Sequence, residues 1–191
     1  MPTGKVIFLN GSSSSGKTTI LRALQGLLEE PYLEAGIDKF IWMLPARYLD
    51  RPLWDEVLGR ADRAGKTGHD LVHGMHQAIA ALARSGCNVL ADHVLVERDW
   101  AQECALLFHS LPAWSIGIRC PLAELEKREA GRRDRTLGQA RLQHALVHRY
   151  VRYDLEVDSA DLDPEQCARA ILSRLKTHPQ AFARMHSTGM L

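Results

Sequence analysis

The sequence predicts an α/β fold in which helices flank a five-stranded, mainly parallel sheet in three layers. Strand-like and helix-like segments alternate along the chain, which is typical of a parallel sheet covered by helices. The first apolar segment also leads directly into a glycine- and serine-rich loop and then into a helical pattern. The 191 residues suffice for one substantial core, and we expect a single domain over residues 1–176.

Short apolar segments form the predicted strands. They are residues 5–10, 32–37, 88–91, 114–118 and 153–158. The first of them is a continuous apolar run of the kind that is buried inside a parallel sheet. Asp38 ends the second strand and Asp92 ends the third.

The predicted helices have apolar side chains at helical spacing and recognisable ends. They cover residues 18–28, 40–44, 69–84, 99–109, 122–130, a segment that ends near 150, and 164–176. Pro45 stops the short turn over 40–44, because proline cannot continue a helix. Gly86 terminates the third helix, and Pro121 precedes the fifth.

Three segments do not fit the regular pattern. Residues 45–68 contain two prolines, three glycines and many charges, and we expect an insertion that covers a substrate. Residues 131–136 interrupt two helices with a run of arginines and predict a lid. Residues 177–191 show no clear period, so we expect a flexible C-terminal tail.

Composition excludes several classes of function. The chain has 24 Lys and Arg against 23 Asp and Glu, so no basic field points to nucleic acid or to an anionic membrane. No apolar run approaches the ~20 residues of a membrane span. The first strand begins too early for a signal peptide, and the four scattered cysteines suit reduced thiols, so we expect a cytoplasmic protein. The sequence is compatible with a homo-oligomer and does not determine the oligomeric state.

A complete phosphate-loop motif, G-x-x-x-x-G-K-[ST], follows the first strand and begins the first helix. Its candidate nucleotide-binding residues are Gly11, Ser12, Ser13, Ser14, Ser15, Gly16, Lys17 and Thr18. The backbone N–H groups of such a loop cradle phosphates, the lysine reaches the β- and γ-phosphates, and the threonine hydroxyl holds Mg²⁺. The motif therefore predicts a nucleotide ligand, and a serine-rich turn before a helix is the alternative.

Two aspartates at strand ends are candidate catalytic groups, because ligands bind at the carboxyl ends of parallel strands. Asp92 can hold Mg²⁺ opposite Thr18, or it can be a turn or helix-capping residue. Asp38 can accept the proton of an acceptor hydroxyl, or it can cap the following helical turn. Both aspartates together indicate phosphoryl transfer.

Arginines after Gly131 are candidates for stabilising the charge that spreads over a transferred phosphoryl group. They are Arg132, Arg133 and Arg135. A solvated charged loop is the alternative, and the pattern alone does not select one arginine.

A histidine face and an apolar group have more than one interpretation. His69, His73 and His76 share one helix face, where they can be an ordinary polar surface, contact substrate or bind a metal. No neighbouring cysteine or carboxylate in the sequence completes a metal site. Nearby apolar residues can line a substrate pocket or pack in the core; these are Trp42, Met43, Leu44 and Trp54.

The chain resembles the chloramphenicol phosphotransferases, which are phosphate-loop kinases that transfer phosphate from ATP to an antibiotic hydroxyl. The resemblance covers about residues 5–175, and its most specific parts are Gly36-Ile37-Asp38 and the Tyr-Asp-Leu-Glu-Val-Asp stretch over 153–158. It implies a fold like that of nucleotide-monophosphate and shikimate kinases, with ATP and Mg²⁺. Residues 46–68 depart from the family pattern in the region that covers the acceptor.

The resemblance also implies roles for particular residues. Asp38 matches the family's base, Lys17 and Thr18 match its phosphate and magnesium contacts, and Arg135 falls in its nucleotide-side arginine stretch. We therefore take Asp38, Lys17 and Arg135 as candidate catalytic residues, and Arg132 with Arg135 as further nucleotide contacts. A metabolite kinase for sugar acids or shikimate-like compounds and a non-catalytic nucleotide-binding switch remain alternatives.

Overall fold

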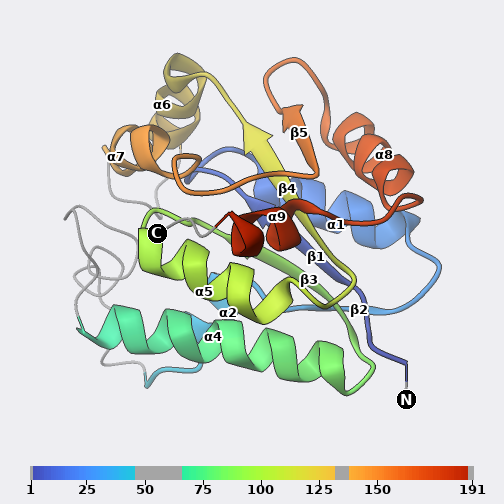
Figure 1. Cartoon of the computed structure of the whole chain (residues 1–191). Coiled ribbons are helices and arrows are strands. Elements are labelled where there is room, and N and C mark those ends of the chain that lie inside the picture. The colour runs from blue at the N-terminus through green and yellow to red at the C-terminus, as the bar shows by residue number, and fades with distance from the viewer. Residues whose placement is uncertain (1, 46–65, 132–137, 189–191) are drawn as a thin grey trace.

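The chain folds around a parallel five-stranded sheet with the order β2-β3-β1-β4-β5 (Figure 1). The computed structural model describes residues 2–45, 66–131 and 138–188. The strands are β1 (Val6–Asn10), β2 (Tyr32–Glu34), β3 (Asn88–His93), β4 (Ala113–Arg119) and β5 (Leu155–Asp158). All four neighbouring pairs are parallel, so the predicted fold class is confirmed.

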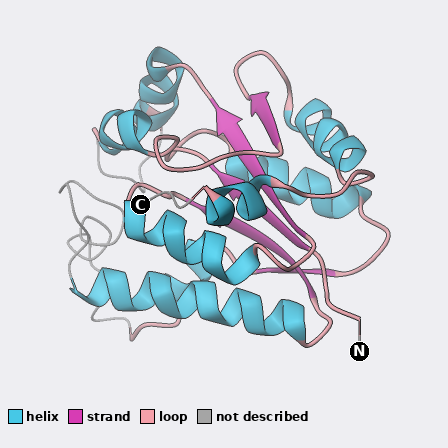
Figure 2. Ribbon diagram, in the orientation of Figure 1, coloured by secondary structure: helices cyan, strands magenta, loops and turns pink. Residues whose placement is uncertain are grey.

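Helices cover both faces of the sheet, as the ribbon diagram shows (Figure 2). They are α1 (Lys17–Leu27), α2 (Ile37–Ile41), α4 (Lys66–Arg84), α5 (Arg98–Phe108), α6 (Leu122–Ala130), α7 (Gln139–Leu146), α8 (Pro164–Arg174) and α9 (Ala181–Ser187). Helices α1 and α8 pack together on one face, whereas α4, α5 and α9 cover the other. Within the described ranges, no helix combines the length and the apolar character of a membrane span.

The two apolar layers meet at β1, which lies at the centre of the sheet. Val6 and Phe8 point into the cluster formed with α4, α5 and α9, and Ile7 and Leu9 point into the cluster formed with α1 and α8. All four side chains are fully buried. The strand can therefore carry apolar residues at every position, as its sequence indicated.

Several element ends differ from the sequence-based expectations. The second strand ends at Glu34, not at 37, and residues 66–68 of the expected cover form the first turn of α4. The helix expected to reach residue 150 ends at Leu146. Strand β3 continues to His93, so Asp92 lies inside the strand and does not follow it. The remainder of the expected cover, residues 46–65, lies outside the described residues.

The expectation of a flexible tail is wrong for residues 181–187, which form α9. Phe182 and Met185 are buried in the core, and the Phe182 ring packs edge-on against Phe8. Apolar burial of this kind fixes a terminal helix even when its sequence is short and has little periodicity.

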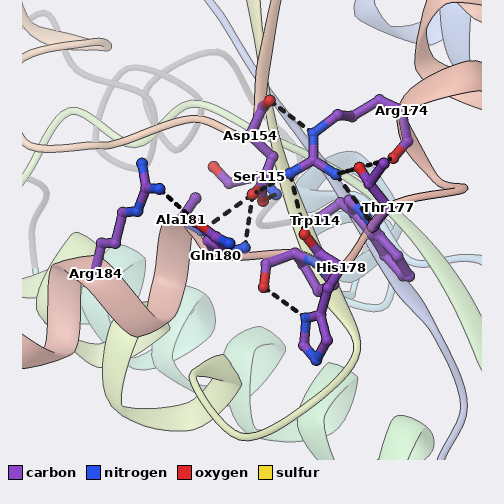
Figure 3. A network of polar contacts seen from close by, with 10 residues as sticks. Trp114, Ser115, Asp154, Arg174, Thr177, His178, Gln180, Ala181 and Arg184 are labelled. Atoms are coloured by element: carbon purple, nitrogen blue, oxygen red, sulfur yellow. Dashed lines mark hydrogen bonds and ion pairs between the residues drawn. The ribbon is translucent and has the colours of Figure 1, made fainter.

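A buried carboxylate connects α9 to the sheet (Figure 3). Asp154 accepts hydrogen bonds from the backbone N–H groups of Gln180 and Ala181 at 2.7 and 3.1 Å, and from that of Ser115 at 3.0 Å. The Arg174 guanidinium pairs with the same carboxylate at 2.9 Å. Since these partners come from β4, α8 and α9, one side chain ties three elements together.

Candidate active site

The phosphate loop joins β1 to the N-terminus of α1, at the carboxyl edge of the sheet. The backbone turns there through left-handed conformations at Ser14 (φ 63°) and Gly16 (φ 85°). Glycine adopts such a conformation without strain, and Gly16 is the N-cap of α1. The helix end supplies N–H groups and a partial positive charge, which together favour an anion.

Polar groups of the loop are buried and suit phosphate oxygens. The Lys17 ammonium donates hydrogen bonds to the carbonyl oxygens of Gly11 and Ser12 at 2.8 and 2.7 Å. The hydroxyls of Ser14 and Ser15 are buried and have no hydrogen-bond partner within the described part of the chain. Buried donors without acceptors are costly, so these hydroxyls and the lysine fit a polyphosphate.

A cleft of about 180 Å³ opens beside the loop and brings the two predicted aspartates together. Asp38, Asp92, Lys17 and Thr18 all line it. The Thr18 hydroxyl donates to Oδ2 of Asp92 at 3.3 Å. This pair offers oxygen ligands of the hard type that Mg²⁺ prefers, so the site fits that ion.

The Asp92 carboxylate is nearly buried, and its charge is only partly compensated. Burial raises the pKa of Asp92, and the nearby charges of Asp38 and Glu34 raise it further. The Lys17 ammonium and the hydrogen bond from Thr18 act in the opposite direction. The cleft therefore concentrates negative charge that a bound cation would offset.

The position of Asp92 requires a glycine at residue 36, a role that the sequence did not predict. A Cβ atom at Gly36 would lie 1.6 Å from Oδ1 of Asp92, which no side chain can tolerate. The glycine lets the entry to α2 lie directly against the strand that carries Asp92. The Gly-Ile-Asp stretch was the available signal.

Asp38 occupies a different local structure from the one expected. It lies in the first turn of α2 and is not at the tip of β2, because the chain leaves the sheet after Glu34. An acidic residue at this helix position interacts favourably with the helix dipole. The short helix nevertheless places Asp38 in the cleft.

The apolar residues after α2 differ in their burial. Trp42 and Met43 are 66% and 68% exposed, whereas Leu44 packs partly buried against the core. Trp54 lies outside the described residues. Of the two interpretations, core packing does not apply to Trp42 and Met43, and a role in lining a substrate pocket stays a prediction.

A larger groove of about 680 Å³ adjoins the other side of the phosphate loop. It is lined by Gly16, Thr19, the end of α6 and residues 159–164. The Arg128 guanidinium supports its wall by donating to the Ser159 carbonyl oxygen at 2.8 Å. The groove is therefore continuous with the loop and bordered by residues of the β5–α8 connection.

The predicted arginines lie outside the described residues, so their contacts are not assigned. The buried carboxylate of Glu129 precedes the segment with Arg132, Arg133 and Arg135 and binds the residues that follow it. Glu129 of α6 accepts hydrogen bonds from the N–H groups of Gly138 and Ala140, each at 2.8 Å.

A buried polar network that the sequence did not predict lies next to the phosphate loop, around Asn10. Asn10, the last residue of β1, donates through Nδ2 to the Val147 carbonyl oxygen and to the Tyr153 hydroxyl, each at 2.7 Å. Its Oδ1 accepts the Leu95 N–H at 2.8 Å. The Tyr153 hydroxyl also lies 2.6 Å from Nδ1 of His148. A polar residue at the end of an apolar strand was the only sequence signal.

The histidine face of α4 packs against α5, where Glu103 supplies the carboxylate that the sequence did not reveal. Nδ1 of His73 and Nδ1 of His76 each lie 2.6 Å from Oε2 of Glu103. The ligand atoms of these three residues lie within 4.8 Å of one another, a group that could hold a metal ion. The described residues that line the cleft include none of the three.

When both rings are neutral, the hydrogen-bond network around His76 determines which ring nitrogens carry protons. Nδ1 of His93 accepts the Val94 N–H at 2.7 Å, so neutral His93 carries its proton on Nε2. That atom lies 2.8 Å from Nε2 of His76, which must accept. Nδ1 of His76 is then protonated and donates to Glu103. A metal at this nitrogen would require a different arrangement of both rings.

Comparisons with known proteins agree on one family. The sequence profile described as "Chloramphenicol phosphotransferase-like protein" matches residues 4–176. A Mycobacterium tuberculosis H37Rv protein, provisionally named an O-phosphotransferase, is 34% identical over 200 residues. The alignment covers 97% of this chain and 89% of that protein.

Solved kinase structures share the fold. The Mycobacterium tuberculosis APS kinase in complex with AMPPNP and APS aligns with a TM-score of 0.67 at 17% identity, over 93% of this chain and all of that one. A Sinorhizobium meliloti gluconokinase aligns with a TM-score of 0.62 at 16% identity, over 92% of this chain and 94% of that one. An Acinetobacter baumannii shikimate kinase in complex with shikimate aligns with a TM-score of 0.58 at 14% identity, over 90% of this chain and 92% of that one.

Proposed function

Because the chain belongs to the chloramphenicol phosphotransferase-like family and has the fold of a P-loop kinase, we propose that it transfers the γ-phosphoryl group of ATP to a hydroxyl of a small molecule. The observation that carries the proposal is the cleft at the phosphate loop. It brings together a lysine, a threonine–aspartate pair and a second aspartate. A site that only bound phosphate would not need two carboxylates beside it.

Asp38 is the proposed base of the reaction. The acceptor oxygen forms a bond to the γ-phosphorus as the bond between that phosphorus and the β–γ bridging oxygen breaks. The acceptor proton passes to the Asp38 carboxylate, and ADP leaves. The position of Asp38 in the first turn of α2, facing the same cleft as Lys17, supports this role.

The phosphate loop and the arginine segment are proposed to stabilise the transferred charge. Lys17 would exchange the carbonyl oxygens of Gly11 and Ser12 for phosphate oxygens, and Arg132 and Arg135 would approach from the segment after α6. Thr18 and Asp92 would hold Mg²⁺, which when bound neutralises charge on the β- and γ-phosphates.

The 680 Å³ groove is the proposed site of the nucleoside. It is continuous with the phosphate loop at Gly16 and Thr19, so a base and ribose placed there would leave the phosphates on the loop. Residues 159–164 border it and would contact the base. This arrangement leaves the cleft with Asp38 for the acceptor.

The acceptor belongs to one of two chemical groups. The family resemblance favours the hydroxyl of an antibiotic such as chloramphenicol. Sugar acids and shikimate-like compounds are the second candidates, because a gluconokinase and a shikimate kinase share the fold. A panel that contains members of both groups, incubated with γ-labelled ATP and analysed by mass spectrometry, identifies the acceptor and the phosphorylated oxygen.

An Asp38→Asn variant tests the mechanism. Transfer should fall by about 10²–10⁴-fold, because a general base contributes about that factor. ATP affinity should change less than about threefold, because Asp38 is proposed to contact the acceptor and not the nucleotide. The matched control is Asp70→Asn, at an exposed residue of α4 paired with Lys66.

Two outcomes would contradict the proposal in different ways. Full activity of Asp38→Asn would remove Asp38 as the base and leave the kinase assignment intact. ATP binding by the unmodified protein without a phosphorylated product across the panel would favour a nucleotide-binding switch.

A further inference from the structure

Helix α7 contacts the phosphate loop through one buried side chain. The Oε1 atom of Gln143 accepts the backbone N–H of Ser13 at 2.6 Å. Because the partner is an N–H donor, the amide atom that faces it must be the oxygen. Gln143 is 1% exposed and Ser13 is 7% exposed, so water does not readily replace this acceptor.

Helix α7 is itself held at both ends. At its N-terminus the Glu129 carboxylate accepts the N–H groups of Gly138 and Ala140. Beyond its C-terminus the Val147 carbonyl oxygen accepts from Asn10, the residue that directly precedes the phosphate loop. The helix therefore provides a fixed support that carries Gln143 and contacts the loop at Ser13.

We propose that Gln143 is a positioning residue that holds the phosphate loop in its nucleotide-binding conformation. The proposal rests on the function proposed above, since it assigns ATP to this loop. Gln143 acts through the Ser13 amide and does not itself need to touch the nucleotide. Neither the motif nor the family comparison assigns it this role.

Loss of the acceptor should act on nucleotide affinity more than on catalysis. Without Gln143, the buried Ser13 N–H would lack a partner, and the loop would move to expose it to water. The conformation that binds ATP would then be a minor state. The apparent affinity for ATP would then fall in proportion to the fraction of molecules whose loop is still in the binding conformation. Once ATP is bound, the loop is ordered again and the transfer step is largely preserved.

A Gln143→Met variant tests this inference, because methionine has a similar shape and lacks the acceptor. We expect the KM for ATP and the Kd measured by calorimetry to rise about tenfold, and kcat to change less than about twofold. The control is Gln25→Met in α1, where the side chain donates to the Tyr32 carbonyl oxygen at 3.2 Å, away from the loop. It should lose stability without a change in ATP affinity.

Hydrogen exchange of the unmodified protein gives a test that needs no variant. Before ATP is added, the Ser13 amide should exchange slowly, because Gln143 already holds it. Rapid exchange of this amide would overturn the inference, as would an ATP affinity of Gln143→Met equal to that of the control. A failure of the unmodified protein to bind ATP would instead contradict the proposed function.

Discussion

Asp92 illustrates a residue whose functional position works against stability. The cleft buries its carboxylate beside Asp38, and burial raises its pKa. A raised pKa means that the folded state disfavours the ionised form relative to the unfolded chain. At neutral pH the ionised carboxylate therefore costs folding free energy, and this cost is lost as the pH falls and the group is protonated.

Replacing Asp92 with Asn should separate stability from activity. We expect the midpoint of thermal unfolding at pH 7.5 without nucleotide to rise by roughly 2–5 °C, because the buried charge is removed. Transfer activity should fall at least about 100-fold. The gain in stability should shrink as the pH is lowered. An Asp92→Asn protein that is less stable than the unmodified protein at every pH would show that the hydrogen bond with Thr18 outweighs the buried charge.

Helix α9 shows how an element can depend on partners distant in sequence. Its N-terminal N–H groups are satisfied by Asp154, and its apolar face fills the space beside Phe8 and Phe108. A short helix gains little from its own propensity, so these contacts determine whether it forms.

An Asp154→Asn variant should destabilise the whole domain. It removes the buried carboxylate that pairs with the partly exposed Arg174 guanidinium, so we expect a loss of about 3 kcal/mol in the free energy of unfolding by urea. The control is Glu165→Gln, which breaks an exposed pair with Arg169 and should cost less than about 1 kcal/mol. Equal effects of the two substitutions would contradict the assigned role of Asp154.

At the scale of the whole molecule, three buried or partly buried histidines are held in the neutral form. Burial lowers the pKa of His76 and places that of His93 well below 6.5. Burial also lowers the pKa of His148 to about 3, with nearby Arg119 contributing. The unfolded chain would bind protons at these residues near pH 6.5, whereas the folded chain does not.

This difference in proton binding predicts that acid weakens the fold. Stability from the buried histidines is complete above about pH 6.5 and declines as the pH falls below it, because the unfolded state gains protons first. The thermal midpoint should fall by several degrees between pH 7.0 and 5.5. His178→Asn, at an exposed residue, should keep this pH dependence, and His93→Gln should weaken it. An unchanged midpoint from pH 7.0 to 5.5 would refute the prediction.

The parts of the fold and site that could be predicted from the sequence are those with a local sequence pattern. The β1 segment, the phosphate loop and α1 are contiguous, and parallel strand order brings Asp92 to the same edge. The contacts of Gln143 with Ser13 and of Glu103 with His76 join residues far apart in sequence, and no periodicity reports them. The same holds for α9, whose capping carboxylate is 26 residues away from Gln180.

The edge-on contact between the Phe8 and Phe182 rings joins the first strand to the last helix, and this has a consequence for biosynthesis. A chain that is still being translated holds β1 long before α9 exists. The apolar surface around Phe8 then stays open until α9 emerges from the ribosome. Folding of this domain is therefore completed only after α9 has been made, and a ribosome that pauses before α9 leaves an exposed core for chaperones to cover.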